Sequence, residues 1–264
     1  MQLSPQSFAA VTDFFHQSSG IRLSADKLAL VQGRLQRLAN ERGDRDLDSY
    51  VRQVLSGSDP AEQVRLVDRL TTNETYFFRE PQHFAFLAGL LTKRSASQPF
   101  RVWSAASSSG EEAYSIAMVL HDRLGDAAWE VVGTDLSTAM VDAARQALYP
   151  MNRAQNMPEY YRKQYCLKGE GAYEGQMLIH RKLRERVRFE TANLLEPLPA
   201  LGEFDVIFLR NVLIYFDTES KREIVLQLLP LLKPGAHLFS GHAESLSNLN
   251  LPVRPVQAAV YQHA

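Results

Sequence analysis

The sequence has few of the features that mark secreted and membrane proteins. It contains a single cysteine, Cys166, so no internal disulfide can form, and this usage is typical of a reducing cytoplasm. No run of about 18 apolar residues occurs, so no membrane-spanning helix is expected. The first residues also lack the basic segment and apolar core of a signal peptide. We therefore expect a cytoplasmic protein without direct membrane insertion.

Patterns of charge and of metal ligands are also lacking. The formal net charge is −1, so nothing indicates an attraction to nucleic acid or to an anionic membrane. The seven histidines are scattered without metal-ligand spacing, so no metal site is predicted, and His242 is interpreted as a structural or surface residue. With 264 residues, of which 45% are hydrophobic, the chain can form one large globular domain or two modest ones.

Two domains are predicted from the hydrophobic pattern. Residues 1–82 show apolar residues at helical spacing, which predicts a small N-terminal helical domain. Residues 83–96 are predicted to be a linker. From residue 97 to residue 264, short apolar runs alternate with amphipathic helices, which predicts a mostly parallel sheet with helices on both faces. The fold class is therefore α/β, with a Rossmann-like sheet.

The elements of the sheet domain follow from its apolar runs. Strands are predicted at 100–106, 129–134, 187–191, 204–209 and 236–240, helices at 111–124 and 137–148, and an antiparallel closing strand at 257–262. Residues 164–186 do not fit the alternation, because glycines there precede the alternating run MLIHRKL. They predict two or three short antiparallel strands inserted as a β-subdomain, with a surface loop and one hairpin as the alternative.

The turn after the first strand carries small residues followed by two carboxylates. Ligands of such sheets lie at the carboxyl ends of the strands, and the small residues 107–110 let the backbone approach a ligand closely. The turn lacks the GxGxxG pattern, and Glu111 and Glu112 would repel a pyrophosphate but attract an ammonium group. S-adenosylmethionine carries an ammonium and a sulfonium and no phosphate. The alternative is that both glutamates only complement the helix dipole.

Two further strand ends suit the same cofactor. Asp135 ends the second strand, where an acidic residue can accept hydrogen bonds from both ribose hydroxyls, although it could instead cap a helix. Asn193 and Leu194 follow the third, where an amide can pair with the edge of an adenine and an apolar side chain can contact its face. A plain turn is the alternative at Asn193. Together with the first turn, Asp135 favours the cofactor interpretation.

Two segments are candidates for the substrate side. The fourth strand leads into Leu209, Arg210 and Tyr215, with polar and aromatic groups at its carboxyl end, although such aromatics often only pack in a core. The stretch 71–81 joins the two domains and is dense in hydroxyl, amide, aromatic and guanidinium groups. It could equally be a capped helix start with two core phenylalanines.

Taken in order, these segments resemble the CheR family of chemoreceptor glutamate methyltransferases. The resemblance covers nearly the whole chain and is carried by LTTNETYFFRE, RVWSAASSSGEEAYSIAM, GTDLS, ANLLE, FLRNVLIYFD and PLLKPGAHLFSGHAESLSNL. Ala113 stands where the family often has proline, which a helix start tolerates equally. The resemblance implies a class I methyltransferase sheet with the helical domain and β-subdomain described above.

The resemblance also implies an activity and a site. It implies transfer of a methyl group from S-adenosylmethionine to glutamate side chains of chemoreceptor cytoplasmic domains, with S-adenosylhomocysteine as the product. Glu112 would hold the amino group of the cofactor and Asp135 the ribose, and Leu209 and Arg210 would contribute largely through their backbone. The implied cofactor-binding residues are Asn73, Thr75, Arg79, Glu112, Asp135, Asn193, Leu194, Leu209 and Arg210, and the implied catalytic residues are Arg79 and Tyr215.

The implied reaction needs neither a general base nor a general acid. A glutamate carboxylate, with an ordinary pKa of about 4.3, is already an anion at neutral pH, and a sulfonium donor leaves as a neutral group. The lack of a catalytic histidine or metal pattern is consistent with this chemistry. Arg79 is expected to orient the incoming carboxylate.

Two surfaces are candidates for receptor binding. Arg34 and Arg37 lie three residues apart in a basic helix that could dock an acidic receptor helix, with a solvated surface as the alternative. The expected β-subdomain resembles the part of some family members that holds a receptor's C-terminal pentapeptide by strand addition.

Three other functions remain alternatives at this point. The first is a methyltransferase of the same fold that acts on another signalling protein or on a small molecule. The second is a cofactor-binding module without catalytic activity. The third, a nicotinamide-dependent dehydrogenase, is disfavoured by the missing glycine pattern.

Overall fold

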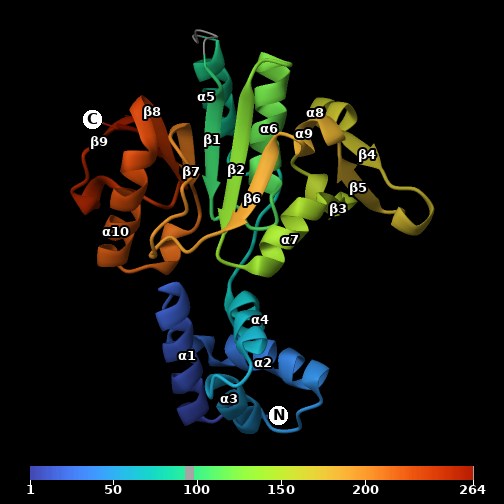
Figure 1. The fold of residues 1–264 in the computed structure, drawn as a ribbon, viewed down its shortest axis with the longest axis vertical. Coiled ribbons are helices and arrows are strands. Elements are labelled where there is room, and N and C mark those ends of the chain that lie inside the picture. The colour runs from blue at the N-terminus through green and yellow to red at the C-terminus, as the bar shows by residue number, and fades with distance from the viewer. Residues whose placement is uncertain (93–97, 264) are drawn as a thin grey trace.

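The computed structural model describes residues 1–92 and 98–263 of the protein. A helical domain lies at one end of the molecule, and a sheet domain with helices on both faces forms the rest (Figure 1). The helical domain consists of α1 Pro5–Ser19, α2 Leu28–Arg42, α3 Leu47–Leu55 and α4 Pro60–Leu70. Among the described residues, no helix combines the length and the hydrophobicity that crossing a membrane requires.

Capping side chains begin the helices of the first domain. The side chains of Ser4, Asp46 and Asp59 each accept a hydrogen bond from a backbone N–H in the first turn of α1, α3 and α4, respectively. The apolar faces that follow meet in one core, which includes the fully buried Phe15 and Tyr50. The predicted helical domain is therefore present, and α1, α3 and α4 begin where cap residues occur in the sequence.

The large sheet has the strand order β6-β2-β1-β7-β8-β10-β9. The first five strands in this order are parallel, and β10 and β9 are antiparallel to their neighbours. The strands are β1 Phe100–Ala105, β2 Trp129–Asp135, β6 Val187–Thr191, β7 Phe204–Leu209, β8 Leu232–Ser240, β9 Val253–Gln257 and β10 Val260–His263. The predicted parallel strands are confirmed, and the continuous apolar runs are explained by burial on both faces.

Helices cover both faces of the sheet. The first face packs against α5 Pro81–Leu91, α6 Glu111–Leu124 and α7 Thr138–Gln146, and the second packs against α10 Thr218–Leu228. Side chains alternate between these layers, so Val102 belongs to the first core and Trp103 to the second.

Three predicted boundaries were wrong. The expected strand 257–262 is part of a hairpin, because Ala259 adopts a left-handed φ of 58° and reverses the chain between β9 and β10. The helix predicted to reach residue 148 ends at Gln146, because Ala147 has a φ of 55°. The predicted linker 83–96 is occupied through residue 91 by α5, whose Leu87 is fully buried in the sheet domain. Residues 93–97 of that linker lie outside the described residues.

The inserted β-subdomain is present as a three-stranded antiparallel sheet of order β3-β5-β4. Its strands are β3 Leu148–Pro150, β4 Cys166–Lys168 and β5 Gln176–Ile179. In the sequence, the helix α8 Glu159–Tyr165 lies between β3 and β4. The insertion begins earlier than predicted, because β3 precedes residue 164. The run MLIHRKL is a strand only as far as Ile179, since His180 then caps the short helix α9 Arg181–Arg184.

Candidate functional site

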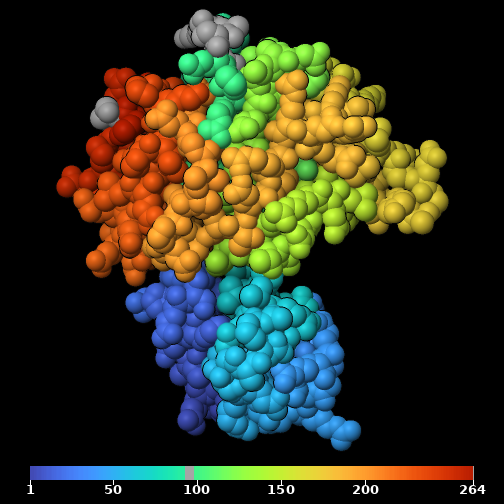
Figure 2. Space-filling view, viewed as in Figure 1, coloured from blue at the N-terminus to red at the C-terminus, as the bar shows by residue number. Residues whose placement is uncertain are grey.

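A cleft lies between the carboxyl edge of the large sheet and the helical domain. It contains about 1340 Å³ of space, including the part open to solvent. Its walls come from the α1–α2 connection, from residues 70–79, and from the ends of β1, β2, β6 and β7. The two domains meet at this level of the molecule, as the space-filling view shows (Figure 2). This is the edge at which doubly wound sheets bind ligands.

The turn after β1 has an unusual backbone. Ala106 and Ser108 have left-handed φ values of 61° and 48°, a strain that proteins tend to keep at functional sites. Gly110 has a φ of 94°, and a Cβ there would lie 2.9 Å from the Cβ of Ala144, so only glycine fits. Ser107 lines the cleft, and its hydroxyl is buried without a hydrogen-bond partner among the described residues, which is unusual for a polar group.

Asp135 lies at the end of β2 with its carboxylate on the cleft. Its two oxygens accept backbone hydrogen bonds from Ser108 at 2.8 Å and from Ser137 at 2.9 Å. Burial raises the pKa of Asp135 to about 6 despite these hydrogen bonds. The cap of α7 is Ser137, whose hydroxyl accepts from the N–H of Met140, so the helix-cap alternative for Asp135 was wrong.

Glu112 and Arg210 form a buried ion pair beside the turn that follows β1. Arg210 donates to Glu112 Oε2 at 2.8 Å, and Ser104 donates to Glu112 Oε1 at 2.7 Å. The second guanidinium nitrogen of Arg210 donates to Glu80 Oε2 at 3.0 Å and to the carbonyl of Arg79 at 2.5 Å. Burial raises the pKa of Glu112, and the charge of Arg210 opposes that rise. The side chain of Arg210 thus has a structural role that the expected backbone role did not include.

The connection 71–80 supplies both a wall of the cleft and part of the core. Asn73, Thr75 and Arg79 all line the cleft. The guanidinium of Arg79 donates to the carbonyl of Glu74 at 3.0 Å and lies 5.6 Å from the ring centroid of Tyr76. Phe77 and Phe78 are buried in the core of the sheet domain. The two core phenylalanines are therefore confirmed, whereas α5 begins at Glu80 without a side-chain cap.

Tyr215 and Phe216 separate into two environments. The half-buried Tyr215 lines the cleft, and burial raises its pKa while the nearby charge of Arg79 opposes the rise. Phe216 is buried in the second core of the sheet domain, as the packed-aromatic alternative held. The structure thus brings Arg79 and Tyr215 together at one cleft.

Asn193 and Leu194, both expected beside the adenine, line the cleft. The amide of Asn193 also donates to the carbonyl of Ser18 in α1 at 3.1 Å and accepts from the N–H of Leu195 at 3.1 Å, so it joins the two domains. Leu209 is fully buried in the core and is not among the residues that line the cleft.

Sequence reasoning missed three carboxylates. Glu80 pairs with Arg210, and Glu244 accepts backbone hydrogen bonds from Asn211 at 2.6 Å and Ile214 at 3.2 Å, which fixes the loop after β7. Asp68 of α4 accepts from the hydroxyl of Thr138 at 3.0 Å and so ties the helical domain to α7. No local pattern indicates these roles, because each partner lies at least 30 residues away.

The expected basic docking face is only partly free. Arg34 donates to the carbonyls of Leu70 at 2.6 Å and Thr71 at 3.1 Å, so it satisfies carbonyl groups at the end of α4. Arg37 is exposed. Arg34 is thus engaged within the chain, and docking of a partner on this face stays a prediction.

Comparisons with known proteins match both domains. A family model described as "CheR methyltransferase, all-alpha domain" matches residues 6–71, and one described as "CheR methyltransferase, SAM binding domain" matches residues 73–262. "Chemotaxis protein methyltransferase" of Escherichia coli is 38% identical over 252 residues, which are 94% of this chain and 87% of that protein. "Chemotaxis protein methyltransferase 2" of Pseudomonas aeruginosa is 37% identical over 263 residues, 98% of this chain and 93% of that protein.

Proposed function

This chain belongs to the CheR methyltransferase family, and from that premise we propose that it methylates glutamate side chains of chemoreceptor cytoplasmic domains. The donor is S-adenosylmethionine, and the product on the receptor is a glutamate methyl ester. The observation that carries the proposal is the match of both domains to this family, with the cleft lying between those two domains.

The residues of the cleft fit the cofactor. Ser107 offers a buried hydroxyl without a partner among the described residues, and Asp135 offers a carboxylate at the end of β2. Glu112 adds a second carboxylate, which suits the ammonium group. We propose that Asp135 holds the ribose, that Glu112 holds the amino group, and that Leu194 contacts the adenine. When bound, S-adenosylmethionine supplies a methyl group activated by the sulfonium charge.

Arg79 and Tyr215 are proposed to position the glutamate of the receptor. The guanidinium of Arg79 can hold a carboxylate by a charge-assisted hydrogen bond, and Tyr215 lies on the same cleft. Their task is alignment and exclusion of water rather than proton transfer, because the glutamate is already an anion. No histidine or cysteine lines the cleft within the described ranges 1–92 and 98–263, and this reaction needs none.

The receptor helix is proposed to dock over the mouth of the cleft on the helical domain. Leu28 and Leu30 at the start of α2 are exposed apolar residues, and Lys27 and Arg22 add positive charge beside them. Lys27, Arg22 and Leu30 also line the cleft, so a helix bound there would reach Arg79. Exposed apolar residues edged by positive charge suit an amphipathic acidic helix.

The β-subdomain is proposed to hold the C-terminal pentapeptide of a receptor by strand addition. Strand β4 lies at the edge of the small sheet, and its Leu167 is exposed. Tyr173, in the following loop, is also exposed, so the edge carries apolar side chains for a guest strand. A receptor without its tail should then be methylated more slowly at low concentration by this protein.

The proposal is tested by methyl transfer from labelled S-adenosylmethionine to a receptor cytoplasmic fragment, followed by mild alkali. Esters release volatile methanol under alkali, whereas N-methyl groups stay on the protein. Alkali-labile label on the receptor is expected, and it should be lost with the Asp135→Ala enzyme. Label that resists alkali, or transfer only to another signalling protein, would reject the proposed substrate.

A further inference from the structure

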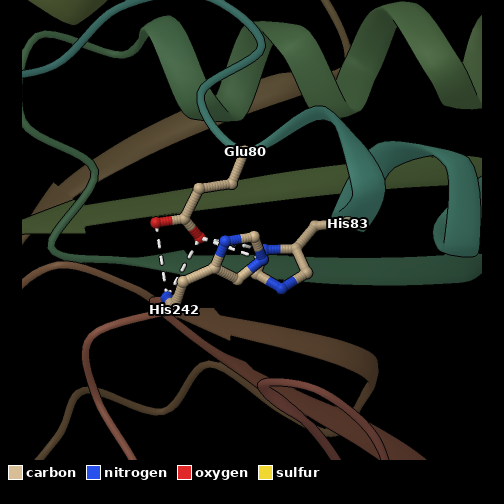
Figure 3. A group of neighbouring side chains, drawn as sticks. All are labelled: Glu80, His83 and His242. Atoms are coloured by element: carbon tan, nitrogen blue, oxygen red, sulfur yellow. Dashed lines mark hydrogen bonds and ion pairs between the residues drawn. The ribbon is translucent and has the colours of Figure 1, made fainter.

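Glu80, His83 and His242 come together at one place although no sequence motif joins them. Glu80 and His83 lie at the start of α5, and His242 follows β8 (Figure 3). Nδ1 of His83 lies 3.4 Å from Glu80 Oε2, and Nε2 of His242 lies 4.0 Å from the same oxygen. One ligand atom from each residue lies within 4.8 Å of the others. Two imidazoles and one carboxylate form a ligand set that suits zinc.

The spacing is close to that of a metal centre. Zinc bonds of about 2.0–2.2 Å at a tetrahedral angle place two ligand atoms about 3.4 Å apart. Glu80 and His83 already have this separation. The side chain of His242 is 44% exposed, so it can rotate to close the remaining distance, and it leaves a path from solvent.

His83 supplies an independent indication of a ligand. It is fully buried, and neither of its ring nitrogens has a hydrogen-bond partner among the described residues. Buried polar atoms are nearly always satisfied, so an unsatisfied nitrogen that faces a carboxylate needs an explanation.

Charges of both signs surround the cluster. The carboxylates of Glu80 and Glu112 share the single guanidinium of Arg210, which leaves a net charge of −1 before an ion binds. Arg210 contacts the same Glu80 oxygen that faces both histidines. An ion bound to that oxygen must therefore compete with Arg210 for it.

We propose that Glu80, His83 and His242 bind a Zn²⁺ ion and that the bound ion lowers the affinity of the cleft for S-adenosylmethionine. The coupling passes through Arg210, which also holds Glu112 on the wall of the cleft. An ion that weakens the Arg210–Glu80 pair frees Arg210 to move and so disturbs Glu112. The metal site stands by itself, whereas the effect on methyl transfer rests on the proposed function.

Zinc binding to tag-free, EDTA-treated full-length protein tests the site, measured by competition with a chromogenic chelator. The wild-type protein is expected to bind one Zn²⁺, and His242→Ala should bind it at least tenfold more weakly. His263→Ala is the matched control, because this partly exposed histidine lies in β10 and outside the cluster. Equal zinc affinity of the two variants, or the absence of binding to the wild-type protein, would overturn the site.

Calorimetric titration of S-adenosylmethionine, with and without Zn²⁺, tests the coupling. The dissociation constant of the wild-type protein should rise severalfold with zinc, and that of His242→Ala should stay the same. Zinc that binds without changing the cofactor affinity would overturn the coupling. Both titrations are done without a receptor, so their outcome is independent of whether the methylated group is glutamate.

Discussion

The substitution Arg210→Met tests the buried ion-pair network beneath the cleft. The side chain of Arg210 is 1% exposed and contacts Glu112, Glu80 and the carbonyl of Arg79. Methionine keeps the apolar stem but leaves both carboxylates without their counterion. Breaking a buried pair in this way costs about 3–5 kcal/mol in the free energy of unfolding.

The destabilisation should depend on pH in a defined direction. Burial already raises the pKa of Glu112, and Arg210 is the main charge that opposes the rise. Without Arg210, the pKa of Glu112 in the folded protein lies further above its value of about 4.3 in the unfolded chain. At a pH above the folded pKa, ionised Glu112 therefore lowers the free energy of unfolding. This cost diminishes as the pH falls through that value. The variant should therefore lose less stability at about pH 5 than at about pH 8.

Urea unfolding followed by tryptophan fluorescence measures the loss in the free energy of unfolding of the sheet domain. Both tryptophans, Trp103 and Trp129, lie buried in the sheet domain. Arg181→Met is the matched control, because its pair with Glu185 is exposed on both sides and should contribute less than about 1 kcal/mol. A loss for Arg210→Met no larger than that of the control would refute the reasoning.

Four further predictions concern the cleft and the turn beside it. Asp135→Asn should weaken S-adenosylmethionine binding about tenfold or more in calorimetry, since charge-assisted hydrogen bonds contribute about 1.5–3 kcal/mol. Wild-type affinity should also fall as the pH falls through about 6, where Asp135 becomes protonated, and a flat profile would exclude Asp135 as a ribose ligand. Arg79→Ala should lower turnover, and normal turnover in a folded variant would remove Arg79 from the mechanism. Gly110→Ala should lose about 1–3 kcal/mol in thermal unfolding, because the new Cβ meets Ala144 at 2.9 Å in a left-handed backbone, and an unchanged melting temperature would contradict this.

The parallel strands were predictable because each is a local property of the sequence. Runs such as 204–209 are apolar on both faces, and polar residues follow them where the strands end. Asp135 could be placed on the cleft for the same reason, since the end of a parallel strand has a known position relative to the sheet.

Contacts between distant segments could not be predicted in this way. Arg210 is 98 residues from Glu112 and 130 from Glu80, and the burial that pairs them is a property of the folded chain. The amide of Asn193 donates to the carbonyl of Ser18, which is 175 residues away in the sequence, and no local pattern indicates that contact. Packing of the helical domain gives Arg34 partners at the end of α4 that its position on a basic helix does not indicate.

The central claim is that glutamate carboxylates of a chemoreceptor receive the methyl group, and mass spectrometry of a receptor fragment tests it most directly. The fragment is incubated with the protein and S-adenosylmethionine, digested, and sequenced before and after mild alkali. The proposed function predicts the added mass of one methyl group on glutamate side chains, removed by alkali and absent with Asp135→Ala. Methylation confined to lysine or to another side chain, or cofactor binding without any transfer to the receptor, would contradict it.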